Sequence, residues 1–211
     1  ISHRAIMLAA LAEGESRIEG FLEGEDTRAT AKIFSQLGVR IETPDAHTRI
    51  VHGVGLHGLK ASAEALDCGN AGTGMRLLTG LLSAQAFDSV LVGDASLSKR
   101  PMARVIRLLE AMGAHIDARD GNFAPLRIHG GRVLQGQSVD TQVASAQVKS
   151  ALIFAALYAE GETVITEPRP TRDYTESMLK ALGWPITFEP GRVALCGGGR
   201  LHAVNFRIPG D

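Results

Sequence analysis

The sequence is poor in several residue types that mark specialised classes of protein. It has only two cysteines, Cys68 and Cys196, which lie far apart and show no C-x-x-C spacing. We therefore expect a reduced, cytoplasmic chain without a disulfide scaffold. A net charge of −1 argues against a nucleic-acid surface, which usually needs a strongly basic face. No run of about 18 apolar residues is present, so the sequence predicts no membrane span.

The seven histidines show no spacing that is typical of a metal site. They are scattered along the chain: His3, His47, His52, His57, His115, His129 and His202. We expect them in surface or core positions and predict no metal site and no cofactor. No Ser/His/Asp order stands out either, so nothing indicates a nucleophilic triad.

Glycine, by contrast, is abundant: it makes up 24 of the 211 residues, against an ordinary level of roughly 7%. This excess indicates many tight turns and places where the backbone approaches a ligand. The first residues, from Ile1, already follow a helix-like pattern, and a strand-like pattern leads into Pro209-Gly210-Asp211. We therefore expect the chain to be a fragment of a longer protein.

A threefold repeat organises the chain. Arg28, Arg100 and Arg172 are 72 residues apart, and each comes just ahead of a helix-like apolar pattern that runs out at a glycine. A second type of segment, near 5–18, 75–85 and 152–165, is apolar on nearly every side. Such segments read as buried helices, whereas the amphipathic arginine helices should lie outside them.

Short runs rich in β-branched residues separate the helices and predict strands. They span 16–20, 39–43, 48–51, 89–92, 114–118, 126–129, 163–166, 192–195 and 205–208. With one strand added before the first helix, each unit reads βαβαββ. We predict an α/β fold of three such units with pseudo-threefold symmetry, buried helices and outer sheets. The lobe would be a single domain over 1–211, with units at about 1–52, 53–130 and 131–211.

The sharpest local signal is the glycine-rich segment from Cys68 to Arg76, which precedes a buried helix. Its glycines allow close backbone approach, and the N–H groups of the following helix start can bind an anion. Asn70 and Thr73 add polar side chains. A tight strand-to-helix turn that serves packing alone is about equally compatible with this spacing. The pattern is neither a P-loop nor a dinucleotide fingerprint.

Polar residues also occupy the starts of the equivalent helices. Ser145 and Gln147 open the third buried helix, where Ser145 is either an N-cap or an anion ligand, and Ser2 and Arg4 occupy the same place in the first unit. The repeat would thus direct several positive helix ends at one cleft. The pairs Lys99-Arg100 and Arg172-Asp173 suit carboxylate or phosphate binding, or are plain surface charges. We interpret Glu25-Asp26 as a helix N-cap.

These motifs closely resemble the 5-enolpyruvylshikimate-3-phosphate synthase (EPSP synthase) family, also called 3-phosphoshikimate 1-carboxyvinyltransferases. The resemblance rests on five segments in order: 2–4, 69–76, 99–101, 145–147 and 171–173. It implies one lobe of a two-lobed fold, here the first. It also implies transfer of enolpyruvyl from phosphoenolpyruvate to the 5-hydroxyl of shikimate 3-phosphate, with release of phosphate and without a cofactor.

The resemblance further implies roles for individual residues. Shikimate 3-phosphate ligands would be Ser2, Arg4, Ser145, Ala146, Gln147 and Arg172; phosphoenolpyruvate would contact Asn70, Gly72, Thr73, Arg100 and Gln147. Ala146 stands where many members carry serine, so one phosphate contact would be either lost or supplied by Lys149. Gly72 would leave room for the herbicide glyphosate, which alanine there would exclude.

The catalytic acid and base would lie outside this chain, in the second lobe and a hinge lysine. The isolated chain should therefore bind shikimate 3-phosphate weakly and catalyse no reaction. The complete two-lobed protein, called the parent enzyme below, is expected to be a monomer. Two alternatives stay open: the related transferase that acts on UDP-N-acetylglucosamine, and a non-catalytic phosphate-binding module. The first typically uses a loop cysteine, whereas Cys68 precedes the glycine motif and is expected to be a buried packing residue.

Overall fold

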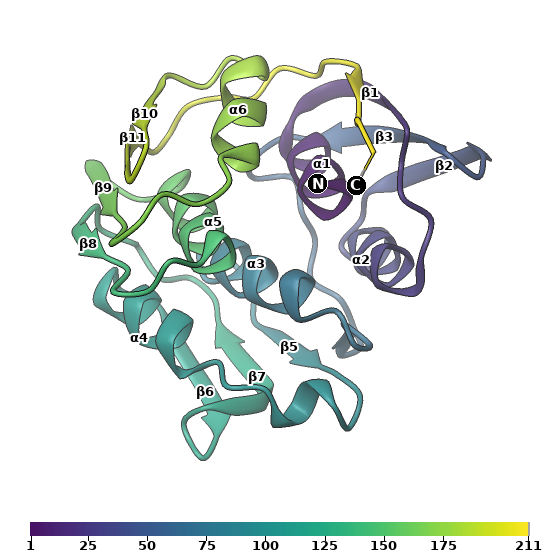
Figure 1. Ribbon diagram of the computed structural model, residues 1–211. Helices are drawn as coiled ribbons and strands as arrows, with labels where there is room; N and C mark the ends of the chain where they lie inside the picture. The colour runs from purple at the N-terminus through teal and green to yellow at the C-terminus, as the bar shows by residue number, and fades with distance from the viewer. Residues whose placement is uncertain (211) are drawn as a thin grey trace.

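A computed structural model describes residues 1–210 of the protein; Asp211, the last residue of the third predicted unit, lies outside them. Within these residues, six α-helices and twelve strands form three four-stranded sheets arranged around the helices (Figure 1). The predicted α/β class is therefore confirmed. None of the helices in this range has the length and apolar character needed to cross a membrane.

The elements follow the predicted repeat. The first unit contains α1 (Ser2–Leu11), β1 (Glu13–Glu19), α2 (Glu25–Gln36), β2 (Arg40–Asp45) and β3 (Thr48–Val54). The second contains β4 (Leu66–Asp67), α3 (Gly72–Leu82), β5 (Ser89–Val92), α4 (Ala103–Ala111), β6 (His115–Arg119) and β7 (Phe123–His129), with a 3-10 turn at Leu97–Lys99. The third contains β8 (Ser138–Asp140), α5 (Ala146–Ala156), β9 (Glu162–Thr166), α6 (Tyr174–Ala181), β10 (Ile186–Glu189) and β11 (Arg192–Cys196).

The three sheets share one topology. Their strand orders are β4-β5-β7-β6, β8-β9-β11-β10 and β12-β1-β3-β2, where β12 is Phe206–Arg207. In each sheet the first pair is parallel and the other two pairs are antiparallel. Ile18 pairs with Phe206, so β12 takes the position of the strand that the first unit lacks. A segment near the end of the chain therefore completes the first sheet.

The sequence patterns missed β4, β8 and β10 and found the other strands. These strands have two, three and four residues, and both β4 and β8 join their sheets through a parallel pair. The two residues of β4 and the three of β8 are too few for a period-2 pattern to be recognised. β10, Ile186–Glu189, does alternate between apolar and polar residues, but over four residues only. The positions of these strands follow from the neighbouring strand.

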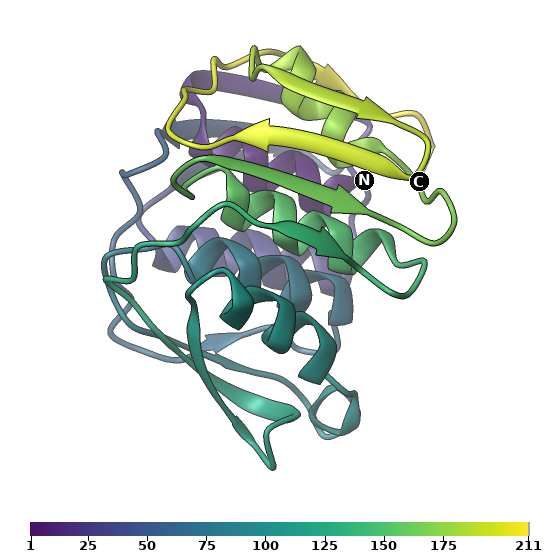
Figure 2. The same cartoon turned by 90° about the vertical axis from the view of Figure 1, so that its left-hand side faces the viewer.

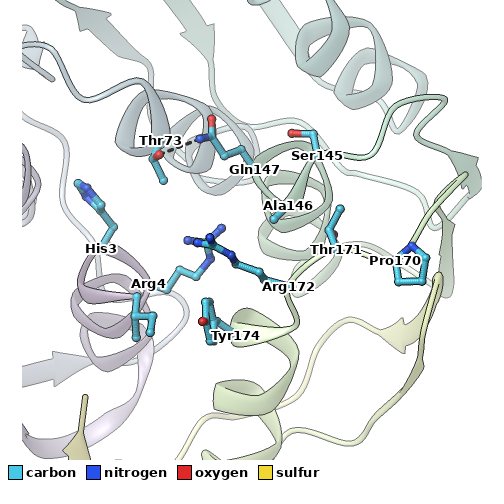
Figure 3. Close-up of a pocket in the computed structure, with 11 residues that line it drawn as sticks. His3, Arg4, Thr73, Ser145, Ala146, Gln147, Pro170, Thr171, Arg172 and Tyr174 are labelled. Atoms are coloured by element: carbon cyan, nitrogen blue, oxygen red, sulfur yellow. Dashed lines mark hydrogen bonds between the residues drawn. The ribbon is translucent and has the colours of Figure 1, made fainter. Parts of the chain in front are cut away.

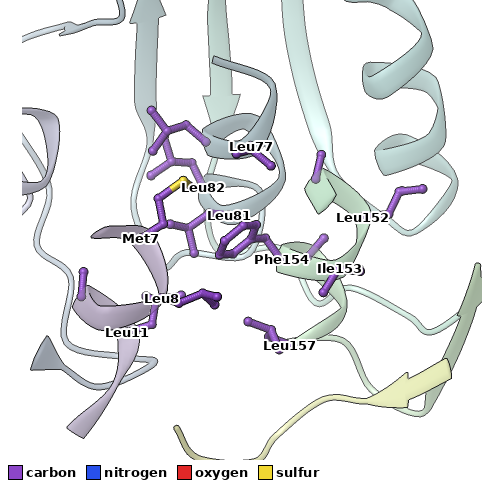
Figure 4. Close-up of a cluster of buried hydrophobic side chains, with 14 of the residues drawn as sticks. Met7, Leu8, Leu11, Leu77, Leu81, Leu82, Leu152, Ile153, Phe154 and Leu157 are labelled. Carbon is purple, nitrogen blue, oxygen red and sulfur yellow. The ribbon is translucent and has the colours of Figure 1, made fainter. Parts of the chain in front are cut away.

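The core lies between the sheets and is built on α1, α3 and α5. Nearly every side chain of these helices is buried, and Figure 4 shows Leu8, Leu81 and Phe154 meeting where the three helices pack. Burial of a large apolar side chain contributes about 1.5–3 kcal/mol, which makes this contact the main stabilising feature. The outer helices bury one face only, as α4 does with Val105, Ile106 and Leu109. The predicted arrangement of inner and outer helices is confirmed.

The start of α2 differs from the prediction. The N-cap is Gly24 in an extended conformation, so Glu25 and Asp26 belong to the first turn and do not cap the helix. Arg28 lies inside α2 instead of ahead of it; its side chain is 58% exposed and pairs with Glu23 at 2.9 Å. The repeat in sequence therefore does not place Arg28 in the same way as Arg100 and Arg172, which do precede α4 and α6.

Candidate functional site

A cavity of about 580 Å³ lies where several helices begin. Its wall contains first-turn residues of α1, α3, α5 and α6 together with the segment that precedes α6, and Figure 3 shows these side chains converging. The lining residues are Ile1, His3, Arg4, Thr73, Ser145, Ala146, Gln147, Pro170, Thr171, Arg172 and Tyr174. Unpaired N–H groups and the dipole at a helix start favour anions, so four such starts make this cavity electrostatically suited to an anion.

Gln147 joins α5 to α3 beside this cavity. Its Nε2 donates to Thr73 Oγ1 at 2.9 Å, the bond drawn in Figure 3, and its Oε1 accepts from Arg76 Nη1 at 2.9 Å. Both ends of the amide are therefore held by groups of the glycine-rich segment. The fixed amide sets the orientation of the Arg76 guanidinium, whose Nη2 also donates to the Pro101 carbonyl oxygen at 3.3 Å.

A second cationic group lies next to Arg76. Arg100 Nη2 donates to Asn70 Oδ1 at 3.0 Å, while Asn70 Nδ2 donates to Asp94 Oδ1 at 3.1 Å. A Cβ on Gly72 would lie 2.6 Å from Arg100 Nη1 and 3.1 Å from Arg76 Nη1, so both guanidinium groups rest against this glycine. Burial, followed by repulsion from Arg100, lowers the pKa of Arg76.

Three arginines at the site have no carboxylate partner in the part of the chain that the structure describes. Arg76, Arg100 and Arg172 form no ion pair within 4.0 Å with residues 1–210. The guanidinium groups of Arg76 and Arg100, which both rest against Gly72, repel each other unless an anion lies between them or nearby. The arrangement therefore suits a ligand that carries several negative charges.

Ser145 and Ala146 present the start of α5 to the cavity. The Ser145 hydroxyl accepts the Val148 N–H at 3.2 Å, which confirms that Ser145 is the N-cap. The N–H groups of Ala146 and Gln147 are in the first turn, where no intrahelical acceptor is available. Ala146 can therefore contribute a backbone donor although its side chain is apolar.

Arg4 reaches from α1 to the seam between α5 and α6. Its Nε donates to Thr175 Oγ1 at 3.0 Å and to Ser150 Oγ at 3.4 Å, and these two hydroxyls lie 2.8 Å apart. Only 8% of Arg4 is exposed, and this part lines the cavity. Arg4 therefore ties α1 to α5 and α6 beside the cavity.

Ser2 is not brought to the cavity. It is 1% exposed, and its Oγ accepts the Leu22 N–H at 3.0 Å, so its hydroxyl holds the segment that leads into α2. The sequence could not show this, because the contact depends on how the chain returns after β1.

Of the two alternatives for the serine that Ala146 replaces, a lost contact or one supplied by Lys149, the structure does not support the second, because Lys149 does not line the cavity. Its side chain is 4% exposed, and its Nζ lies 3.2 Å from Glu167 Oε2 and 3.0 Å from Glu176 Oε2. The other carboxylate oxygen of Glu167 accepts a hydrogen bond from the hydroxyl of Thr171, the residue just before Arg172. This buried charge cluster, Lys149, Glu167 and Glu176, therefore anchors the segment that carries Arg172.

Glu176 gives the charge cluster a measurable pH dependence. Burial raises its pKa, and its Oε1 has no hydrogen-bond partner among the described residues. An acid with a raised pKa in the folded chain stabilises the fold fully below its unfolded pKa of about 4.3, and this stabilisation is lost as pH rises through the folded value. Relative to Glu176→Gln, the wild-type chain should therefore lose stability as the pH rises above about 4.

Urea unfolding of both chains across this range measures the difference. The matched control is Glu110→Gln, which removes an exposed carboxylate from α4 and should leave the difference small at every pH. A stability difference between the wild type and Glu176→Gln that is constant with pH would contradict the raised pKa of Glu176 in the folded chain.

Cys68 is a packing residue, as expected. It is 1% exposed, and burial raises the pKa of its thiol to about 12. It is therefore a neutral thiol at physiological pH and not an acid poised at the site. Cys196 is exposed, and both cysteines are free.

The fold and the cavity define a class: an α/β lobe of three repeated units that directs helix starts and arginines at one cavity. The family model of EPSP synthase (3-phosphoshikimate 1-carboxyvinyltransferase) matches residues 1–211. The chain belongs to the EPSP synthase family.

Curated relatives and solved structures agree with this assignment. The 3-phosphoshikimate 1-carboxyvinyltransferase of Xanthomonas euvesicatoria pv. vesicatoria is 64% identical over 211 residues, which are 100% of this chain and 48% of that protein. The protein of the same name from Xanthomonas oryzae pv. oryzae shows the same values. A structure of EPSP synthase from Acinetobacter baumannii superposes with a TM-score of 0.96 at 53% identity, over 99% of this chain and 47% of the other. The chain thus spans about half the length of the relatives it matches.

Proposed function

We propose that this chain is the substrate-binding first lobe of a 3-phosphoshikimate 1-carboxyvinyltransferase. The complete enzyme would move the enolpyruvyl group of phosphoenolpyruvate onto the 5-hydroxyl of shikimate 3-phosphate and release phosphate. The observation that carries the proposal is the linked pair of anion subsites, in which Gln147 connects the cavity of helix starts to the guanidinium pair of Arg76 and Arg100.

Two adjacent cationic subsites fit a reaction between two anions. The cavity side, with Arg4, Ser145, Ala146, Gln147 and Arg172, would hold shikimate 3-phosphate. Ser2 would act indirectly, by fixing the start of α2 through Leu22.

The guanidinium side would hold phosphoenolpyruvate through Arg100, with Asn70, Gly72, Thr73 and Gln147 forming its wall. The small volume of Gly72 matters here, because a methyl group at this position would displace the Arg100 guanidinium. The same space would admit glyphosate in the parent enzyme.

In this reaction the lobe would bind the two substrates and orient them. Its helix starts and arginines need no reorganisation when charge develops on the substrates. Proton transfer would fall to groups of the second lobe, which is the partner that the proposal requires. Closure of the two lobes on the ligands would exclude water.

The test uses the complete enzyme with both lobes. Arg172→Ala should raise the KM for shikimate 3-phosphate about 10- to 100-fold, because a charge-assisted hydrogen bond contributes about 1.5–3 kcal/mol. Phosphate release from phosphoenolpyruvate is the measured quantity. Arg169→Ala is the matched control, because Arg169 is an exposed arginine of the same proline-rich segment and does not line the cavity.

Equal effects of the two variants would remove Arg172 from the proposed site. Phosphate release with UDP-N-acetylglucosamine as acceptor, and none with shikimate 3-phosphate, would assign the parent to the related transferase instead. Calorimetric binding of both sugars without any phosphate release by the complete protein would favour a binding module.

A further inference from the structure

The β6–β7 hairpin brings together two histidines and an aspartate that are separated in sequence. His115 and His129 are directly opposite each other in the antiparallel pair, and Asp117 is two residues along β6. Residues at i and i+2 of a strand share one face, so all three side chains lie on the same side of the sheet. The hairpin forms one edge of its sheet, and none of the three lines the cavity of helix starts.

The distances between their ligand atoms are short. His129 Nε2 lies 2.7 Å from Asp117 Oδ2, and His115 Nε2 lies 3.6 Å from Asp117 Oδ1. The two imidazole rings are stacked, with centroids 4.1 Å apart and an interplanar angle of 23°. One nitrogen from each ring and one carboxylate oxygen lie within 4.8 Å of one another.

We propose that His115, Asp117 and His129 form a surface site for a divalent transition metal ion such as Zn²⁺. Zinc binds imidazole nitrogen and carboxylate oxygen at about 2.0–2.2 Å, so neighbouring ligands in a tetrahedral site are about 3.4 Å apart. The separations of His115 from Asp117 Oδ1 and of His129 from Asp117 Oδ2, 3.6 Å and 2.7 Å, lie on either side of this value. Small side-chain rotations are therefore enough to seat an ion, with water at the remaining position.

The ligand chemistry selects the class of ion. Two imidazoles suit zinc, copper and nickel, whereas magnesium and calcium prefer oxygen ligands. Asp117 is available as a carboxylate, because the hydrogen bond from His129 lowers its pKa. The side chains of His115 and Asp117 are 49% and 62% exposed, so an ion can enter from solvent.

One group opposes binding. Arg127 pairs with Asp117 across the hairpin and is exposed, so its charge acts against a bound cation. We therefore expect an affinity in the micromolar range and not that of a structural zinc site. A bound ion would tie the edge strand β6 to β7.

A second cluster provides an internal comparison. Glu15, Glu42 and His52 also bring three ligand atoms together, but this set has a single imidazole. Glu42 is already paired with Arg40 at 3.0 Å and with His52 at 2.9 Å. This cluster is the weaker candidate for zinc, because it has one imidazole and its Glu42 carboxylate is already paired with Arg40. His52 therefore serves as a matched control for the two histidines of the proposed site.

The experiment is a calorimetric titration of ZnCl₂ into the purified, untagged chain. The wild type should bind one zinc ion, and His115→Ala and His129→Ala should each weaken binding at least tenfold. His52→Ala should bind as the wild type does, and MgCl₂ should give no binding. Zinc should also raise the melting temperature of the wild type and not that of His129→Ala.

The mutated residues are on the surface, so circular dichroism of each variant is expected to match the wild type. Absence of zinc binding by the folded wild type would overturn the proposal. Equal zinc affinity in the wild type and His129→Ala would also overturn it. Neither readout depends on enzymatic activity, so the result is independent of the proposed function.

Discussion

Replacing Lys149 by methionine is expected to lower the free energy of unfolding by about 3–5 kcal/mol, because two buried carboxylates lose the cation that they share. Glu167 and Glu176 have side chains that are 2% and 4% exposed, so water cannot replace the ammonium group. Methionine has a similar length, and the loss would therefore come from charge and not from a cavity. Chemical denaturation of the purified chain measures the effect.

Two further variants separate charge from packing. Lys32→Met removes an exposed lysine from α2 and should change stability by less than about 0.5 kcal/mol. Adding Glu167→Gln and Glu176→Gln to Lys149→Met should recover much of the lost stability, because no uncompensated charge remains. Failure of this rescue would mean that Lys149 acts through shape alone.

Replacing Gly80 by alanine is expected to destabilise the chain by about 3 kcal/mol or more, although alanine is normally the better helix former by about 1 kcal/mol. A Cβ at position 80 would lie 2.0 Å from the Ala151 carbonyl oxygen, so α3 and α5 touch through their backbones. Separating the two helices would open the core around Leu81 and Phe154. It would also stretch the bond between Gln147 and Thr73, since these residues lie at the starts of the same two helices.

Urea unfolding of Gly80→Ala is the measurement. Gly210→Ala is the control, because its added Cβ would meet nothing within 4 Å and its backbone is not in the left-handed region. That variant should leave the unfolding midpoint unchanged. A stabilised Gly80→Ala chain would show that the two helices can move apart without loss of packing, which would contradict the close contact.

Much of the fold could be predicted because its signals are local. The apolar pattern of α5 and the β-branched residues of β9 are complete within a dozen residues each, so the chain reveals them without knowledge of their neighbours. The cap at Ser145 is equally local, since its hydroxyl reaches only to Val148. Strands such as β4, with two residues, carry no such pattern and are defined by their partners.

The candidate site was only partly predictable. The helix-start motifs pointed to an anion site through residue types, and the geometry brings Arg4, Gln147 and Arg172 to one cavity. The exclusion of Ser2 from this cavity was not visible, and neither was the burial of Lys149. Both outcomes depend on which segment of the chain packs against the residue. A polar side chain that looks free to bind a ligand can instead bond to such a segment, as Ser2 bonds to Leu22 and Lys149 to Glu167.

By itself, then, the sequence determined the threefold repeat, the inner and outer helices, the glycine-rich turn and the membership of the family. Tertiary structure alone decided which side chains meet: Arg76 with Gln147, Lys149 with Glu176, His115 with His129, and β12 with β1. The physical reason is that periodicity and capping act over a few residues of one segment. Long-range pairs are set by the packing of segments and by strand register, which depend on the whole folded chain.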